Sequence, residues 1–262
     1  MKAGADRPFL RRLGRTHLLL TIPPQRATII TAKGTCMGGV SAVEHTALRR
    51  EKERIVTMIA EKMKPLVNNN SAIRAMFEEG KRLARETAEG LSDVPFDLCI
   101  SSPLCRAKET ARIILRNRKT LILEDPRIME MAFGEYEGKC CSKEGWDVPE
   151  SFHRFFDDPA GYQPPEGGES FEDVKKRTGE FLESLYKKDA YQELDILITT
   201  HGAALAGLLN NIKNEPLSCY WGSGVHRNCA VTEVEVINGV PKILSENVVY
   251  YQNVKDPWAE DA

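Results

Sequence analysis

The sequence has no apolar run long enough to span a membrane and no surplus of charge of one sign. Its longest apolar run near the start, residues 17–23, is far shorter than the roughly 20 residues of a membrane-spanning helix. The formal net charge is −2, and acidic and basic residues are interspersed, so we expect no polybasic surface for nucleic acid or lipid headgroups. We therefore predict neither a nucleic-acid partner nor a membrane partner.

The cysteines lack the spacing of a disulfide framework or a zinc site. There are seven, an odd number, and no CxxC pair occurs among them. Basic residues precede the apolar run at residues 17–23, but Pro23 and Pro24 interrupt it and no small-residue cleavage site follows, which argues against a signal peptide. The predicted location is therefore the cytoplasm.

Residues 1–79 read mostly as helix, after two short β-like runs. These runs are residues 17–22 and 27–32, and they are either strands of a sheet or a leader outside it. Helical spacing of apolar and charged residues extends from about Val40 to Met63, and Ser71 is a natural N-cap for a further helix. We treat residues 1–79 as an atypical N-terminal segment.

Strand and helix patterns alternate beyond Pro95. The strand-like runs are residues 96–102, 121–125 and 193–202, and the helical patterns are residues 104–115, 170–188 and 203–212. Two further β-like runs flank Asn238-Gly239, a dipeptide that favours a tight hairpin. The pattern predicts an α/β fold, a three-layer α/β/α sandwich around a mixed, mostly parallel sheet, over residues 80–253 with a tail at 254–262.

Polar side chains follow two of the predicted strands. Ser102 and Arg106 lie between a strand and a helix, and His201 and Gly202 lie at the end of another strand. Ligands of open α/β sheets bind beyond the carboxyl ends of the strands, where helix N-termini present N–H groups. Arginine can bind two phosphate oxygens, and histidine can donate a hydrogen bond or carry a proton. The sequence therefore predicts an oxyanion pocket.

A third segment, residues 128–139, offers candidates for a general acid. It carries Glu130, Glu135 and Glu137 in a loop that also contains glycines. A carboxyl group there could protonate a leaving oxygen, and the spacing does not decide which of the three would do so. The aromatic cluster at residues 146–156 fits core packing and a substrate lid equally well.

Four motifs occur in order: SSPLCRAKETA, EMAFGEYEG, PPEGGESFEDV and TTHGAALAGLL. Together they resemble the histidine phosphatase superfamily, in its phosphoglycerate mutase-like, broad-specificity phosphatase branch, over about residues 80–253. The resemblance implies that Arg106 binds phosphate, that Glu130 donates a proton, and that His201 stabilises the transferred phosphoryl group. It implies substrate-binding positions at Ser102, Glu166, Gly168 and Gly202.

The motif that supplies the nucleophile of that family is absent. The family's first strand ends in Arg-His-Gly, whose histidine carries the phosphoryl group as a covalent intermediate. The spacing back from Gly80 leads to residues 54–63, which contain no histidine. The tripeptide most similar to this motif is Lys33-Gly34-Thr35. It lies too early in the chain, and lysine is not an ordinary phosphoryl carrier. The nucleophile is therefore unknown.

A second resemblance covers residues 58–84, which are similar to the leading segment of class I pyridoxal-phosphate aminotransferases. No Schiff-base lysine motif follows, so neither that activity nor that cofactor is implied. Two explanations of the missing nucleophile motif stay open: a foreign segment has replaced the first strand, or the sequence has simply diverged from that of the family.

By resemblance, the chain is a phosphomonoester hydrolase that acts on a small phosphorylated metabolite without a metal or cofactor. The missing nucleophile predicts an inactive or severely impaired enzyme. The rivals are a non-catalytic phosphate-ester binding protein and a defective fusion product that cannot complete its sheet. The preferred ester, the choice between phosphatase and mutase, and a homodimeric state are left open.

Overall fold

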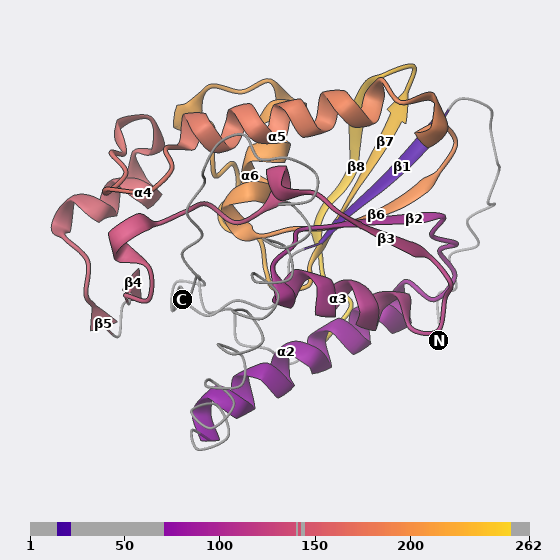
Figure 1. Ribbon diagram of the computed structural model, residues 1–262, viewed down its shortest axis with the longest axis horizontal. Coiled ribbons are helices and arrows are strands. Elements are labelled where there is room, and N and C mark those ends of the chain that lie inside the picture. Colours follow the sequence, from indigo (N-terminus) through magenta and orange to yellow (C-terminus); the bar gives the residue numbers. More distant parts are fainter. Residues whose placement is uncertain (1–14, 22–70, 140, 143–144, 253–262) are drawn as a thin grey trace, which may run out of the picture.

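The computed structural model describes residues 15–21, 71–139, 141–142 and 145–252 (Figure 1). Its centre is a six-stranded sheet in the order β3-β2-β6-β1-β7-β8. The strands are β1 (Arg15–Thr21), β2 (Leu98–Ser101), β3 (Leu121–Glu124), β6 (Asp195–Thr199), β7 (Val231–Ile237) and β8 (Val240–Val248). The main helices are α2 (Ser71–Gly90), α3 (Cys105–Leu115), α5 (Phe171–Tyr186) and α6 (Gly202–Lys213).

The predicted fold class is confirmed. β3, β2, β6 and β1 pair in parallel, whereas β7 and β8 continue the sheet antiparallel. Helices α5 and α6 cover one face of the sheet and α2 and α3 the other, so the layers are helix, sheet and helix (Figure 1). None of the helices in the described ranges is long and apolar enough to cross a membrane.

β1 lies inside the sheet, between β6 and β7. It pairs in parallel with β6 over His17–Thr21 and antiparallel with β7 over Arg15–Thr21. Leu18 and Leu20 are fully buried, at 0% exposure. Of the two alternatives for this run, sheet strand or leader, the structure therefore shows the strand for residues 17–21, and residue 22 lies outside the described residues. The second run at 27–32 and the helical pattern up to Met63 lie outside the described residues, and the expected boundary at residue 80, which falls within α2, stays a prediction.

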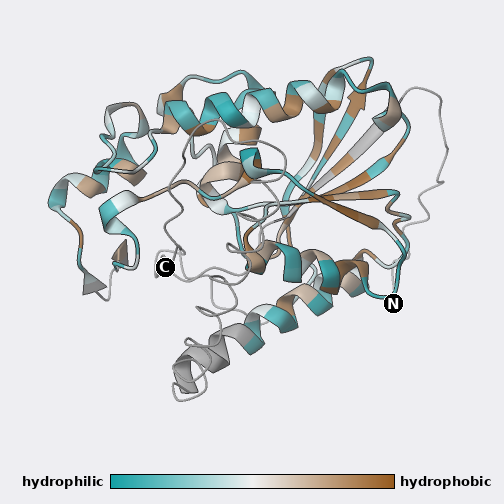
Figure 2. Cartoon of the chain, viewed as in Figure 1, coloured by the Kyte–Doolittle hydropathy of each residue, from teal (hydrophilic) through white to brown (hydrophobic). Residues whose placement is uncertain are grey.

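The two faces of the sheet are covered by separate apolar clusters. Figure 2 shows the strands between the helices coloured largely brown, as hydrophobic. Leu20 and Ile198 pack toward α5 and α6, together with Phe181 and Leu208. Leu197, the neighbour of Ile198 in β6, belongs to a different cluster with Ile114 and Cys99. This alternation is what a strand buried on both faces requires, because successive side chains point to opposite sides.

The aromatic residues form a third cluster, next to the sheet's carboxyl edge. Phe152 and Phe155 are 2% and 5% exposed and pack with Phe171 and Tyr220. The segment that carries them includes the short elements β4 (Cys141–Ser142), β5 (Gly145–Trp146) and α4 (Arg154–Asp157). The most buried aromatic rings are therefore core, whereas Trp146 and Phe156 are only partly buried.

Local signals account for where several elements begin and end. The Ser170 hydroxyl accepts from the Asp173 N–H at 3.1 Å, and the Asp173 carboxylate accepts from the Ser170 N–H at 2.9 Å, a capping box at the start of α5. Asn238 and Gly239 have φ values of 52° and 77°, the left-handed conformation that a tight hairpin turn between β7 and β8 requires.

We expect the substitution Leu20→Ala to lower the free energy of unfolding by about 2–5 kcal/mol, because it opens a cavity at a central strand. Urea denaturation followed by circular dichroism measures the effect. Val240→Ala is the control, since Val240 lies on edge strand β8 and is 68% exposed. Equal midpoints for Leu20→Ala and the unsubstituted chain would contradict the placement of β1, and a broad, non-cooperative transition would favour a defective product.

Candidate functional site

The carboxyl ends of β2 and β6 lie at the same edge of the sheet. Ser101 and Thr199 are partners in the parallel register, and their hydroxyls are joined by a hydrogen bond of 2.9 Å. The Ser102 N–H donates to the Thr199 carbonyl at 2.9 Å. A short loop joins each of these strands to the helix that follows it. The two loops carry residues predicted to bind an oxyanion, and they start side by side.

Three of the predicted site residues are in contact at this edge. The Arg106 Nε–H donates to Nδ1 of His201 at 3.1 Å, and Nε2 of His201 lies 2.7 Å from Oγ of Ser102. Because Nδ1 accepts a hydrogen bond, the proton of the neutral ring is on Nε2, which then donates to Ser102. The geometry fixes both the orientation and the tautomer of the imidazole.

The imidazole of His201 is held in its neutral form. The side chain is 0% exposed, and burial lowers its pKa well below the ordinary value of 6.5. The positive charges of Arg106 and Arg177 lower it further. At neutral pH, His201 is therefore a neutral hydrogen-bond donor through Nε2.

Arg106 lies in the first turn of α3, where its guanidinium reaches the edge of the sheet. Its Nε–H is used by His201. Within the part of the chain that the structure describes, its two terminal amino groups make no hydrogen bond and no ion pair. They are therefore available to bind two oxygens of one anion.

Glu130 lies at the N-terminus of α6. Its Oε1 accepts from the N–H groups of Ala203 at 3.0 Å and Ala204 at 3.4 Å. These are N–H groups of the first turn, which have no partner within the helix, and a carboxylate there is also stabilised by the helix dipole. Glu130 thus lies within one helical turn of His201, the residue that precedes α6.

The other two carboxyls of the same loop are placed differently. Glu135 is exposed, and Oε1 of Glu137 accepts from the Phe133 N–H at 3.0 Å within its own loop. Of the three candidate acids, Glu130 has a contact with the helix that follows His201. Its catalytic role stays a prediction.

The remaining predicted positions divide into two groups. Gly202 is the first residue of α6, directly beside His201. Glu166 and Gly168 lie in a loop joined to the segment 133–135, where the Glu135 N–H donates to the Glu166 carbonyl at 3.2 Å. The Glu166 side chain is exposed, and within the described residues no hydrogen bond links Glu166 or Gly168 to Arg106 or His201.

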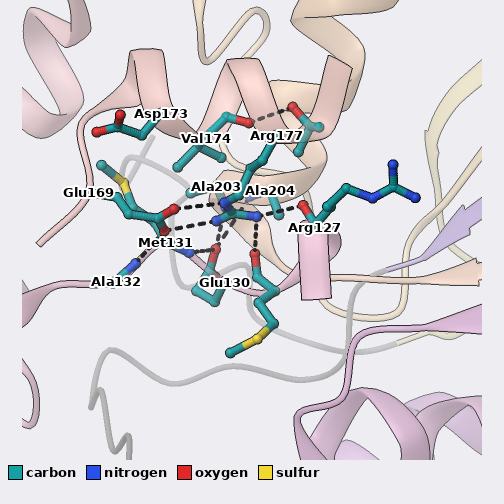
Figure 3. A network of polar contacts seen from close by, with 12 residues as sticks. Arg127, Glu130, Met131, Ala132, Glu169, Asp173, Val174, Arg177, Ala203 and Ala204 are labelled. Carbon is teal, nitrogen blue, oxygen red and sulfur yellow. Dashed lines mark hydrogen bonds and ion pairs between the residues drawn. The ribbon is translucent and has the colours of Figure 1, made fainter. Parts of the chain in front are cut away.

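Arg177 was not among the residues singled out from the sequence, although it lies at the centre of the polar network (Figure 3). It forms an ion pair with Glu169 at 2.8 Å and contributes to the low pKa of His201. A signal was present: Arg177 follows Val174 by three residues and precedes Phe181 by four, so it lies on the buried stripe of α5. A cation on such a stripe is typically paired.

The position after β1 bears on the missing nucleophile. Thr21 is the register partner of Thr199, and His201 is the second residue after Thr199. In the sequence, the second residue after Thr21 is Pro23, within Ile22-Pro23-Pro24. Residues 22–70, including the two earlier candidate positions for the motif, lie outside the described residues, so the nucleophile stays unknown.

A search for a metal centre gives no candidate. Among residues 15–21, 71–139, 141–142 and 145–252, no group of three or more His, Cys, Asp or Glu side chains could hold a metal ion. Metal independence stays a prediction.

We expect His201 to make folding less favourable in acid. Its folded-state pKa lies below the unfolded value of about 6.5, so the unfolded state gains the proton first as the pH falls. The free energy of unfolding should therefore fall below pH 6.5, by up to about 1.4 kcal/mol per pH unit from this residue. His226, whose pKa burial also lowers, adds to the slope.

Urea denaturation between pH 7 and pH 5 measures this slope. His201→Gln should make it shallower, and His153→Gln is the control because that side chain is 49% exposed. An unchanged slope in His201→Gln would contradict the neutral, buried state of the ring.

Several known proteins are similar to this chain in sequence or in structure. Phosphoserine phosphatase 1 of Hydrogenobacter thermophilus is 29% identical over 149 residues, covering 57% of this chain and 69% of that protein. Adenosylcobalamin/alpha-ribazole phosphatase of Escherichia coli is 29% identical over 139 residues, covering 53% and 67%. The structure of Bacillus stearothermophilus YhfR matches with a TM-score of 0.61 and 31% identity, covering 66% and 85%. The model of the histidine phosphatase superfamily (branch 1) matches residues 75–249, and the chain therefore belongs to that superfamily.

Proposed function

We propose that this protein binds the phosphate group of small phosphomonoesters through Arg106 and His201, as a member of a phosphatase family. We also propose that the chain hydrolyses these esters very slowly or not at all, because the Arg-His-Gly motif that supplies the family's nucleophile is absent from its sequence. The observation that carries the proposal is the contact between Arg106 and His201 at the carboxyl edge of the parallel strands.

The relatives support a small phosphorylated substrate. Two of them are named for phosphoserine and for alpha-ribazole phosphate chemistry. The proposal therefore extends to small phosphomonoesters as a class. A cytoplasmic location and a homodimer remain predictions.

Each site residue has a proposed task that its position supports. The free amino groups of Arg106 would bind two phosphate oxygens, and the Nε2–H of His201 would donate to a third in place of Ser102. Ser102 and Gly202 would line the phosphate pocket at the starts of α3 and α6, while Glu166 and Gly168 would border the leaving group. Glu130 would deliver a proton to the leaving oxygen.

Phosphate binding and phosphoester hydrolysis can be separated in this chain because they need different groups. Charge stabilisation by Arg106, His201 and the α6 dipole requires no covalent step. Hydrolysis in this family also requires a nucleophile that takes the phosphoryl group, and assisting groups alone leave only residual catalysis. We therefore place the chain closer to a phosphate-ester binding protein than to an efficient phosphatase.

The first test is binding of orthophosphate and of vanadate by isothermal titration, beside hydrolysis of p-nitrophenyl phosphate in excess chelator. We expect Arg106→Ala to weaken binding about 10- to 100-fold, because charge-assisted hydrogen bonds contribute about 1.5–3 kcal/mol. Arg112→Ala is the matched control, since it removes the same charge from an exposed position of α3. Unchanged binding in Arg106→Ala would refute the pocket, and turnover at ordinary enzyme rates that Arg106→Ala abolishes would refute the claim of impaired catalysis.

A second test introduces the family's Arg-His-Gly motif into the chain. The triple substitution Ile22→Arg, Pro23→His and Pro24→Gly writes Arg-His-Gly directly after β1 in the sequence. We expect p-nitrophenyl phosphate hydrolysis to rise about 100-fold or more, with an acid-labile phosphohistidine trapped on the chain. The control carries Pro23→Gln in place of Pro23→His. Equal activity in the two variants would show that the defect is not the absence of this histidine.

A further inference from the structure

The side chain of Arg177 crosses from α5 to the backbone of the segment that carries Glu130 (Figure 3). Its Nη1 donates to the carbonyls of Arg127 at 2.7 Å and Met129 at 2.8 Å. The side chain is only 16% exposed. Hydrogen bonds from a cation that is largely removed from water are stronger than the same bonds at the surface. Arg177 therefore holds the backbone on the N-terminal side of Glu130.

The C-terminal side of Glu130 is held through Glu169. The guanidinium of Arg177 binds both carboxylate oxygens of Glu169, at 2.8 Å and 3.0 Å. Oε2 of Glu169 in turn accepts from the Ala132 N–H at 2.9 Å. Arg177 thus contacts the backbone directly at residues 127 and 129 and, through its ion pair with Glu169, at residue 132, with Glu130 between them.

We propose that Arg177 is a positioning residue, which holds Glu130 against the first turn of α6, beside the Arg106–His201 pair, by fixing the backbone on both sides of it. The inference rests on the proposed function for its meaning, since Glu130 is the proton donor only if the pocket binds a phosphate ester. The observed contact of Glu130 with the Ala203 N–H is the state that Arg177 maintains.

The planar fork of arginine is essential to this task. Arg177 uses Nε and Nη2 for Glu169 and Nη1 for the two carbonyls, so one rigid group satisfies four acceptors. A lysine ammonium is a single point that cannot reproduce this set of directions. The carboxylate of Glu169 also offsets the positive charge of Arg177 near the buried His201 and Tyr220.

The experiment follows the amide protons of Ala203 and Ala204 by NMR as the pH is lowered. In the unsubstituted chain, the Ala203 amide shift should titrate with Glu130, and Glu130→Gln should abolish that titration. Arg177→Lys and Arg177→Gln should each reduce its amplitude by half or more, and Glu169→Gln should do the same. Thermal unfolding is measured on every variant.

Arg127→Gln is the matched control. The Arg127 side chain also binds a carboxylate, Asp125, and two groups of α5, the Glu180 carbonyl and the Ser184 hydroxyl, but it donates to no atom of residues 129–132 among the described contacts. We expect it to lower the unfolding temperature and to leave the Ala203 titration intact. Loss of that titration in Arg127→Gln as well, or its retention in Arg177→Gln, would overturn the proposal.

Orthophosphate titration of the same samples distinguishes failure of the proposed function from failure of the positioning role. If the unsubstituted chain binds no phosphate, the proposed function fails, while the Ala203 signal still decides whether Arg177 positions Glu130. If phosphate binds and the Ala203 titration is insensitive to Arg177, the proposed function stands and the positioning role fails.

Discussion

The parallel pairing of β6 with strands on both sides is the constraint on which the rest of the structure depends. β2 on one side and β1 on the other have the same direction as β6, so the carboxyl ends of all three strands lie at one edge. The residues after β2 and β6 then meet without any long excursion of the chain. The contact of Arg106 with His201 across 95 positions of sequence is a direct consequence.

The second requirement is to satisfy the polar groups that this edge buries. Ser102 and His201 are fully buried at 0% exposure, and each finds a partner in the other. The N–H groups of Ala203 and Ala204, in the first turn of α6, donate to the carboxylate of Glu130. Unpaired polar groups in such a place cost about 1–3 kcal/mol each. The site is therefore a hydrogen-bonded network whose members depend on one another.

Charge at this edge is balanced only in part. Burial lowers the pKa of His201, and two arginines, Arg106 and Arg177, lie close enough to lower it further. Glu169 is paired with Arg177, whereas the terminal amino groups of Arg106 have no carboxylate partner among the described residues. This leaves a local excess of positive charge at Arg106, which suits an anion such as phosphate. The family's Arg-His-Gly motif is absent from the sequence, so the nucleophile stays unknown.

Much of the fold and part of the site could be predicted from the sequence. Strand and helix periodicity, the Ser170 cap, the Asn238-Gly239 turn and the order of the four motifs are local patterns, set by interactions within a few residues. The sequence alone also determined that no Arg-His-Gly occurs anywhere in the chain.

Three matters were decided only by the tertiary structure: that residues 15–21 form an inner strand of the sheet, that Glu130 accepts from N–H groups of α6, and that Arg177 donates to the carbonyls of Arg127 and Met129. The sequence left these open because strand pairing and side-chain partners depend on residues far away in the chain. Those residues become neighbours only when the sheet and its covering helices pack together.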